Sequence, residues 1–325
     1  LEVAANGKLG EKTNVVVGGL TERRANRDIP ETIPGVQAPA IPGKYSEKHY
    51  SAYVQADHSV RDRLKLVSGV QWNRTGSGHT AAVPRLGAIV PVSETLTLKA
   101  LWGQAFRTAT PLEEFVNVPG VLLGRADLRP EKASTFDVQL FLDRARSQST
   151  LTLFHNQYRD VVERIPAVGA VPGTSTFQNS GVNTIQGLEL EHRGRLARGF
   201  FLTGSVTLQD EKEGKLLVPS YMAKAGVSYS GKNLSGGLFH SHFGCPREAP
   251  APLGGLELNP PAHAINLLSL NVNYKVRAGV PLTLSLYGSN LLGDDMEYTE
   301  FARGWTNTLP IGPGRALYGR IRVEF

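Results

Sequence analysis

The sequence predicts an all-β fold, in the form of a transmembrane antiparallel β-barrel. Apolar and polar residues alternate one by one along many segments, as they do in strands with one apolar and one polar face. The connections between these segments alternate between short and long, as they do at the two rims of an outer-membrane barrel. No helical period of about 3.6 residues persists over any window of a dozen residues.

The alternating segments occur along most of the chain. The clearest is 317–325, where Tyr318, Arg320, Arg322 and Glu324 separate residues that are apolar or glycine. The other segments, from the amino to the carboxy end, are 50–57, 64–72, 96–102, 136–142, 151–158, 188–193, 200–208, 221–229, 268–276 and 282–286. With a partial strand at the amino end, roughly 14 strands are expected. Many reach about 10 residues, which is the length that crosses a bilayer when tilted and exceeds the usual strand of a soluble sandwich.

The connections provide the second argument. The short ones are 59–63, 92–95, 144–149, 193–199, 230–233 and 275–281. The long or middling ones, which fall between them in turn, are 23–44, 108–134, 165–176, 210–219, 244–261 and 291–314. One connection, 75–79, is short where a long one is due. This pattern predicts one rim of turns and one rim of loops that carry recognition.

Composition excludes several other classes. The chain of 325 residues has 35 Lys and Arg against 29 Asp and Glu, a mild net charge of +6 without a basic stripe interleaved with aromatics, so nucleic-acid binding is not expected. It contains no apolar run of about 18 residues that would form a transmembrane helix. Cys245 is the single cysteine, which excludes a disulfide within the chain. The sequence starts at Leu1 without a signal peptide, and we expect it to begin inside a longer polypeptide.

Several motifs occur in an order that resembles the TonB-dependent receptors. They are Pro-Arg-Leu-Gly-Ala at 84–88, Ala-Phe-Arg at 105–107 followed by acidic residues at 113–114, Leu-Arg-Pro-Glu at 128–131, Asn-Ser-Gly at 179–181, Gly-Leu-Glu-Leu-Glu at 187–191, Ser-Asn-Leu-Leu-Gly-Asp at 289–294, Gly-Pro-Gly-Arg at 312–315 and the terminal Phe325. Pro111 comes later than in the commonest form of the family's Ala-Phe-Arg-x-Pro segment. The resemblance covers nearly the whole chain.

The resemblance implies that residues 1–325 are the carboxy-terminal portion of the family's 22-stranded barrel, about 14–15 of its strands, with no plug domain in this chain. It further implies a multi-pass protein of the Gram-negative outer membrane that imports a ferric siderophore or a similar scarce nutrient. The implied partners are TonB, acting through a plug missing here, outer-membrane lipid, and the barrel-assembly machinery, for which Phe325 is the assembly signal.

The resemblance also suggests where the ligand binds. Ferric siderophores are often anionic, and the family's outer loops hold arginines and aromatic residues that pair with such groups. The candidate ligand-binding residues are Arg23, Arg24, Arg27, Arg107, Phe115, Arg125, Tyr298, Phe301, Arg303 and Trp305. Haem is disfavoured, because no histidine lies between Arg107 and Glu131, where the family's haem receptors carry one.

No catalytic residue, cofactor or metal site is predicted. His240 and His242 are a close pair, but a metal site needs further ligands, and we interpret them as lumen-facing or rim residues. Two other functions remain open. One is a passive porin or channel, because a closed barrel of about 14 strands is possible. The other is an outer-membrane hydrolase, for which His155 beside Asn156 is the thin candidate, without a Gly-x-Ser-x-Gly motif.

Overall fold

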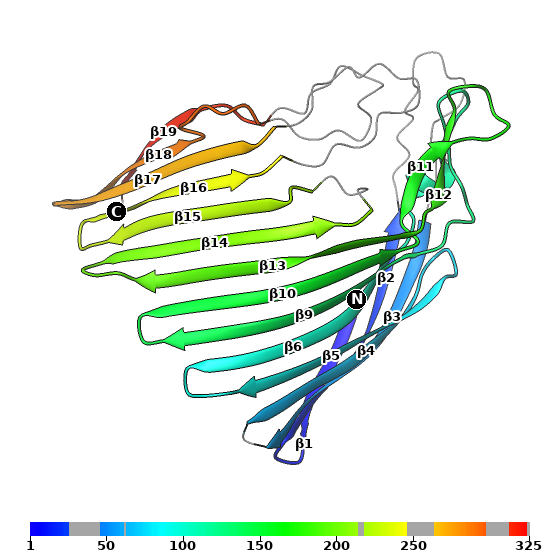
Figure 1. Cartoon of the computed structure of the whole chain (residues 1–325), viewed down its shortest axis with the longest axis horizontal. Coiled ribbons are helices and arrows are strands. Elements are labelled where there is room, and N and C mark those ends of the chain that lie inside the picture. Colours follow the sequence, from blue (N-terminus) through cyan, green and yellow to red (C-terminus); the bar gives the residue numbers. More distant parts are fainter. Residues whose placement is uncertain (26–45, 62, 214–217, 246–262, 297–311, 324–325) are drawn as a thin grey trace. The chain divides into compact units, whose positions relative to one another are not determined.

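The structure, a computed structural model, describes residues 1–25, 46–61, 63–213, 218–245, 263–296 and 312–323. The described residues form a sheet of fifteen strands in the order β1-β2-β3-β4-β5-β6-β9-β10-β13-β14-β15-β16-β17-β18-β19, and a second sheet of four strands in the order β11-β12-β8-β7 (Figure 1). The predicted all-β fold is confirmed. Among these residues, no helix is both long enough and apolar enough to cross a membrane.

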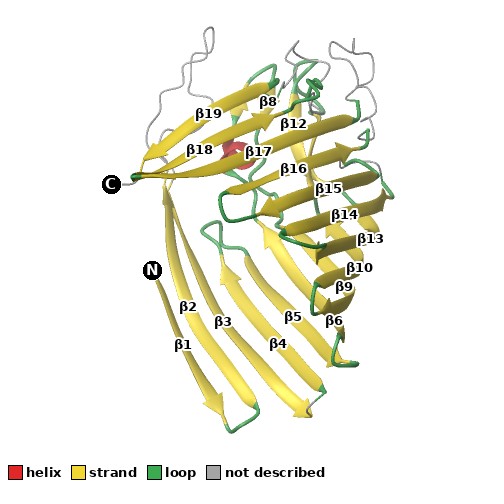
Figure 2. Cartoon of the chain, turned by 90° about the vertical axis from the view of Figure 1, so that its left-hand side faces the viewer, coloured by secondary structure: helices red, strands yellow, loops and turns green. Residues whose placement is uncertain are grey.

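The strands of the large sheet have the following bounds. They are β1 (Glu2–Leu9), β2 (Thr13–Ala25), β3 (Ser46–Arg61), β4 (Leu64–Arg74), β5 (Thr80–Pro91), β6 (Leu96–Arg107), β9 (Glu131–Arg144), β10 (Ser147–Arg159), β13 (Val182–Arg195), β14 (Phe200–Glu211), β15 (Tyr221–Ser230), β16 (Leu234–Phe243), β17 (Ile265–Ala278), β18 (Val280–Ser289) and β19 (Ala316–Val323). The remaining elements are α1 (Pro111–Phe115), β7 (Asn117–Val118), β8 (Leu122–Leu123), β11 (Val162–Pro166) and β12 (Ser175–Asn179), with α1 drawn in red in Figure 2.

The chain divides into two compact units, which are described separately. The first comprises Leu1–Val92, Leu98–Val138 and His155–Thr184, and the second comprises Ser93–Thr97, Gln139–Phe154 and Ile185–Phe325. The predicted alternation of short and long connections is confirmed in both, including the short turn at 75–79.

In the first unit, the antiparallel register of β2 to β5 sorts the side chains onto two faces. Val17 pairs with Val54, Val54 with Val70, and Val70 with Pro84, so apolar side chains line up across four strands. Gln55 lies one residue from Val54 and therefore on the other face, where it pairs with Gly69 and accepts a hydrogen bond from Arg85. One face is thus apolar and the other carries the hydrogen-bonding groups.

The second unit repeats this arrangement. Leu190 pairs with Val206 and Leu238 with Leu270 on an apolar face, whereas Glu189 pairs with Thr207, whose hydroxyl donates to it at 3.0 Å, on the other face. The apolar side chains are not buried: Leu190 is 49% and Leu238 is 47% exposed. An apolar face that stays exposed needs lipid or a partner, because water would oppose its exposure.

The buried hydrophobic residues lie elsewhere. In the part of the chain that the structure describes they are Val116, Val118, Leu128, Phe177, Ile185 and Met296. All but Ile185 lie in the long connections rather than in the large sheet. The strands therefore have no core of their own between two protein layers, which distinguishes this sheet from a soluble sandwich.

Several predicted boundaries are wrong, mostly because a strand continues into the segment predicted as a connection; for example, β17 runs to Ala278 and β18 begins at Val280, within the turn predicted at 275–281. β2 extends to Ala25 and β3 begins at Ser46, so Arg23 and Arg24 lie on a strand. β9 begins at Glu131 rather than after 134, and the loop predicted at 165–176 is largely the tip of the β11–β12 hairpin. At these strand ends apolar and polar residues no longer alternate, although the backbone pairing continues. The sequence pattern therefore did not predict them.

Candidate ligand-binding site

A small folded module lies at the loop end of the first unit. This loop module consists of residues 108–130 and 160–181, with α1, β7, β8, β11 and β12. Its helix begins at a capping box: the Glu113 amide donates to the Thr110 hydroxyl, and the Thr110 amide donates to the Glu113 carboxylate at 2.6 Å. Pro111 occupies the first turn, where its missing N–H has no cost.

Arg107 fastens the loop module to the end of β6. Its guanidinium donates to both carboxylate oxygens of Glu113, at 3.0 and 3.1 Å, and to both of Glu131, at 2.6 and 2.7 Å. Two bidentate pairs fix the planar guanidinium in one orientation. Glu131 also accepts the Val162 amide at 2.7 Å, so β11 is tied to the same carboxylate.

A second set of bonds closes the base of the module around Asn179. Its side-chain oxygen accepts the Arg129 amide at 2.8 Å, and its side-chain nitrogen donates to the carbonyls of Arg129 and Asp160 at 2.9 and 2.7 Å. The Arg129 side chain forms an ion pair with Asp160 at 2.7 Å. The Ala-Phe-Arg, Leu-Arg-Pro-Glu and Asn-Ser-Gly motifs therefore meet in one hydrogen-bonded base.

A pocket of about 520 Å³ opens beside Arg107 at the same end of the strands. It is lined by Arg24, Ala25, Glu47, His49, Thr75 and residues 106–111, which come from β2, β3, the 75–79 turn, the end of β6 and the start of the loop module. Gly76 lets this turn close over the pocket wall, because a Cβ there would collide with the Glu47 side chain. The exceptional short connection thus contributes to the pocket.

The charges at the pocket are largely paired. Arg24 donates to both oxygens of Glu22 at 3.0 and 3.1 Å, and His49 bonds the Glu47 carboxylate at 2.6 Å. Glu114, on α1, is 8% exposed, and its burial together with the negative charges of Glu47 and Glu113 raises its pKa.

The pKa of Glu113, its neighbour in the chain, is shifted in the opposite direction. Burial opposes its ionisation, but the hydrogen bonds from Arg107 and from the Thr110 amide outweigh that effect and lower the pKa of the carboxyl. Two adjacent carboxyl groups are therefore shifted in opposite directions because one is paired with an arginine and the other is not.

The structure brings two of the predicted ligand-binding residues, Arg24 and Arg107, together in the pocket. Arg23 lies on the other face of β2 and donates to the Ser46 hydroxyl at 3.1 Å. Arg125 pairs with Asp127 at 2.6 Å on the exposed surface of the loop module, and Phe115 is 36% exposed on α1. The other candidates, Arg27, Tyr298, Phe301, Arg303 and Trp305, and the assembly signal Phe325, lie outside the described residues.

The sequence reasoning missed the acidic side of the pocket. Glu47 and His49 lie two residues apart on β3 and so share a face. Their spacing in the sequence could have predicted this. Glu114 does not line the pocket, although the charge of Glu47 contributes to the rise in its pKa.

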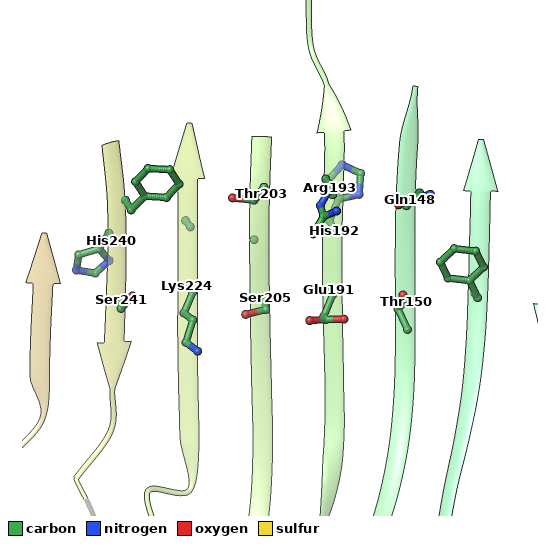
Figure 3. A pocket seen from close by; sticks show the side chains of 14 residues that line it. Gln148, Thr150, Glu191, His192, Arg193, Thr203, Ser205, Lys224, His240 and Ser241 are labelled. Carbon is green, nitrogen blue, oxygen red and sulfur yellow. The ribbon is translucent and has the colours of Figure 1, made fainter. Parts of the chain in front are cut away.

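A second pocket, of about 410 Å³, lies on the polar face of the second unit (Figure 3). Glu191, Ser205 and Lys224 occupy consecutive register positions across β13, β14 and β15, and Ser241 follows on β16. It lies among the strands rather than at the loops, and it offers alternating charges and hydroxyls.

The histidine pair on β16 was interpreted as lumen-facing or rim residues, and the structure separates the two histidines in this respect. His240 pairs with Ala225 and Leu268, on the apolar face, so its assignment to the lumen is wrong. His242 lies on the same face at the strand end, stacks on Tyr221 and bonds the Asn266 side chain at 2.8 Å. Within the described residues, no group of three or more histidine, cysteine or acidic side chains is arranged to hold a metal ion.

A large antiparallel sheet with an exposed apolar face, a polar face, and turns and loops at opposite ends defines the class of outer-membrane β-barrels. Residues 2–291 match the family described as TonB dependent receptor-like, beta-barrel. The chain belongs to this family, which resides in the outer membrane of Gram-negative bacteria.

Similar proteins include a probable TonB-dependent siderophore receptor, PirA, of Acinetobacter baumannii, which is 24% identical over 160 residues, 43% of this chain and 21% of that protein. The crystal structure of the siderophore receptor PirA from Acinetobacter baumannii gives a TM-score of 0.78 at 18% identity, covering 100% of this chain and 54% of that one. The crystal structure of a mutant of the ferric enterobactin receptor PfeA from Pseudomonas aeruginosa gives a TM-score of 0.75 at 18% identity. The match covers 98% of this chain and 52% of that one.

At these identities the likeness to the solved structures shows the fold. The chain spans about half the length of those structures.

Proposed function

We propose that the chain is the carboxy-terminal part of the barrel of a TonB-dependent receptor that binds a ferric siderophore, or a similarly scarce nutrient, and imports it with energy supplied through TonB. The observation that carries the proposal is the loop-end pocket, which combines cations, a carboxylate, hydroxyls and an aromatic ring beside an anchored loop module. Family membership supports it, as do the names of the relatives, which are siderophore receptors.

The proposal extends to the domain organisation and the partners. All of residues 1–325 would belong to the barrel, and the plug on which TonB acts would lie in another part of the polypeptide. The barrel-assembly machinery would recognise the terminal strand through Phe325. The function requires binding and transport rather than covalent chemistry, so no catalytic residue is assigned.

The test is uptake of radiolabelled ferric siderophores by an iron-limited Gram-negative host that expresses the protein and lacks its own siderophore receptors. We expect saturable uptake that disappears when TonB is deleted. Uptake that is linear in concentration and equal without TonB would instead support the passive porin, and single-channel conductance of the purified protein would then be measured.

A further inference from the structure

The apolar face of the first unit carries a cluster of cations at its loop end. Arg23 lies two residues before the end of β2, Lys48 lies two residues after the start of β3, and Arg74 is the last residue of β4. Each is an even number of residues from the valine that marks the apolar face in the same strand, so all three lie on that face. These three residues are called the outer cation cluster.

The three cations are neighbours across adjacent strands. Arg23 lies directly opposite Lys48, and Arg74 lies directly opposite Tyr50, which is two residues from Lys48. With the usual spacing of strands and residues, the backbone positions of the cluster lie within about 12 Å of one another. Like charges this close repel unless an anion lies among them, and a single headgroup could reach all three.

No carboxylate on this face neutralises the cluster. As far as the structure describes them, the residues that β2, β3 and β4 place on the apolar face include no Asp or Glu. Arg23 donates to the Ser46 hydroxyl at 3.1 Å, and none of the three cations forms an ion pair with a described carboxylate. The polar face at the same end differs, because there Arg24 is paired with Glu22.

The side chains beside the cluster change in a regular order along the strands. Tyr50 and Trp72 come next on the same face, each 46% exposed, and Val54 and Val70 follow toward the turn end at 41% and 40%. Cations, aromatic rings and aliphatic chains in this order match the phosphate, interfacial and acyl layers of a lipid leaflet. A protein partner would have to displace the lipid that the rest of this apolar face requires.

We propose that the outer cation cluster binds a phosphorylated lipid in the membrane leaflet at the loop end. The phosphate oxygens accept charge-assisted hydrogen bonds from Arg23, Lys48 and Arg74, and the acyl chains lie along the apolar face toward the turn end. The loop-end pocket, lined by Arg24 and Glu47, is on the other face of these strands, so the lipid site does not depend on which nutrient the receptor binds.

The experiment measures lipid binding to the purified protein in detergent by native mass spectrometry. The probes are diphosphorylated lipid A and the same acylated disaccharide without its phosphates. We expect the phosphorylated form to bind about tenfold more tightly, because only it can accept charge-assisted hydrogen bonds from the cluster. Inorganic phosphate at the same concentration should not displace it, because phosphate alone does not contact the apolar strip.

Variants assign the preference to the cluster. K48Q and, independently, R74Q should each weaken binding of diphosphorylated lipid A about fivefold and leave binding of the phosphate-free form unchanged. The matched control is K8Q, because Lys8 is an exposed lysine on the polar face of β1. Two variants at exposed strand ends are used so that a folding defect in one leaves the other informative, and circular dichroism identifies a folded variant.

Equal binding of the two lipid forms would overturn the proposal and would mean that the cations only extend into the water beside the membrane. Displacement by inorganic phosphate would overturn it in favour of a free-anion site. Unchanged binding in both folded variants, or an equal loss in K8Q, would also overturn it. None of these results bears on the receptor function, which the uptake experiment tests separately.

Discussion

Arg107 and Glu131 lie 24 residues apart in the chain and are joined by two hydrogen bonds of 2.6 and 2.7 Å between guanidinium and carboxylate. They belong to two motifs that the sequence places on either side of a long connection. Their pairing, with Glu113 on the same guanidinium, turns this connection into a folded module.

Replacing Arg107 by alanine should loosen the loop module without unfolding the sheet. The change removes four charge-assisted hydrogen bonds, but the side chain is 44% exposed, so solvent screening reduces the expected loss of local stability to about 1–2 kcal/mol. Hydrogen exchange measured by mass spectrometry should quicken in 111–128 and remain unchanged in β14 to β16.

The matched control is R125A, because Arg125 is equally exposed and also forms a bidentate carboxylate pair, but with Asp127, two residues away in the same loop. An equal effect of R125A and R107A on exchange would contradict the anchoring role of Arg107.

Leu128 should be the most sensitive apolar residue of the loop module. It is 2% exposed and clusters with Val116, Val118 and Phe177, so truncation to alanine leaves a cavity and should cost about 2–5 kcal/mol of module stability. Limited proteolysis should cut L128A within 108–130 faster than the parent protein. L112A, at a site 45% exposed, should behave like the parent, and comparable cleavage of both variants would rule out this core.

Asn179 should not tolerate aspartate, although the two side chains have the same shape. The amide nitrogen donates to two carbonyls, and a carboxylate at this position would repel both of them. We expect N179D to lower module stability by about 1–3 kcal/mol, seen as faster hydrogen exchange in 160–181. Unchanged exchange in that segment would mean that the carbonyls are satisfied in another way.

Glu113 and Glu114 should respond oppositely to neutralisation. The pKa of Glu113 is lowered from its ordinary 4.5, so its charge stabilises the folded module above about pH 4.5, and that contribution is lost as the pH falls through the folded pKa. The pKa of Glu114 is raised from 4.5, so its charge destabilises the module as the pH rises from 4.5 through the folded value.

At pH 7, therefore, E113Q should speed hydrogen exchange in α1 and E114Q should slow it. The E114Q difference from the parent protein should shrink as the pH falls to 4.5, and the E113Q difference only below pH 4.5, as the pH falls through the lowered pKa of Glu113. The same sign for both variants at pH 7 would contradict the assigned environments.

Much of the fold could be predicted from the sequence. A strand with one lipid face and one polar face has an apolar side chain at every second residue, and this alternation identifies the strand and its two faces. The segment 200–208 was predicted from that alternation, and β14 contains it. The short strands β7, β8, β11 and β12 could not be predicted, because they are held by hydrogen bonds between the motifs rather than by their own pattern.

The candidate site was predicted in part. Arg24 and Arg107 were selected for their charge, and they do line one pocket. Their pairing with Glu22, Glu113 and Glu131 could not be predicted, because it depends on register and on the folded loop module. A charge in a sequence indicates a possible contact but not which partner neutralises it.

The central claim is that the apolar face of the strands contacts lipid. It is tested by spin labels placed one at a time at Ser205 and Val206, adjacent residues on opposite faces of β14, in a background where Cys245 is replaced by serine. In lipid vesicles, the label at 206 should be relaxed mainly by oxygen, which concentrates in lipid, and the label at 205 mainly by a water-soluble nickel chelate. Relaxation of the label at 206 by the nickel chelate, or by neither reagent, would contradict the account.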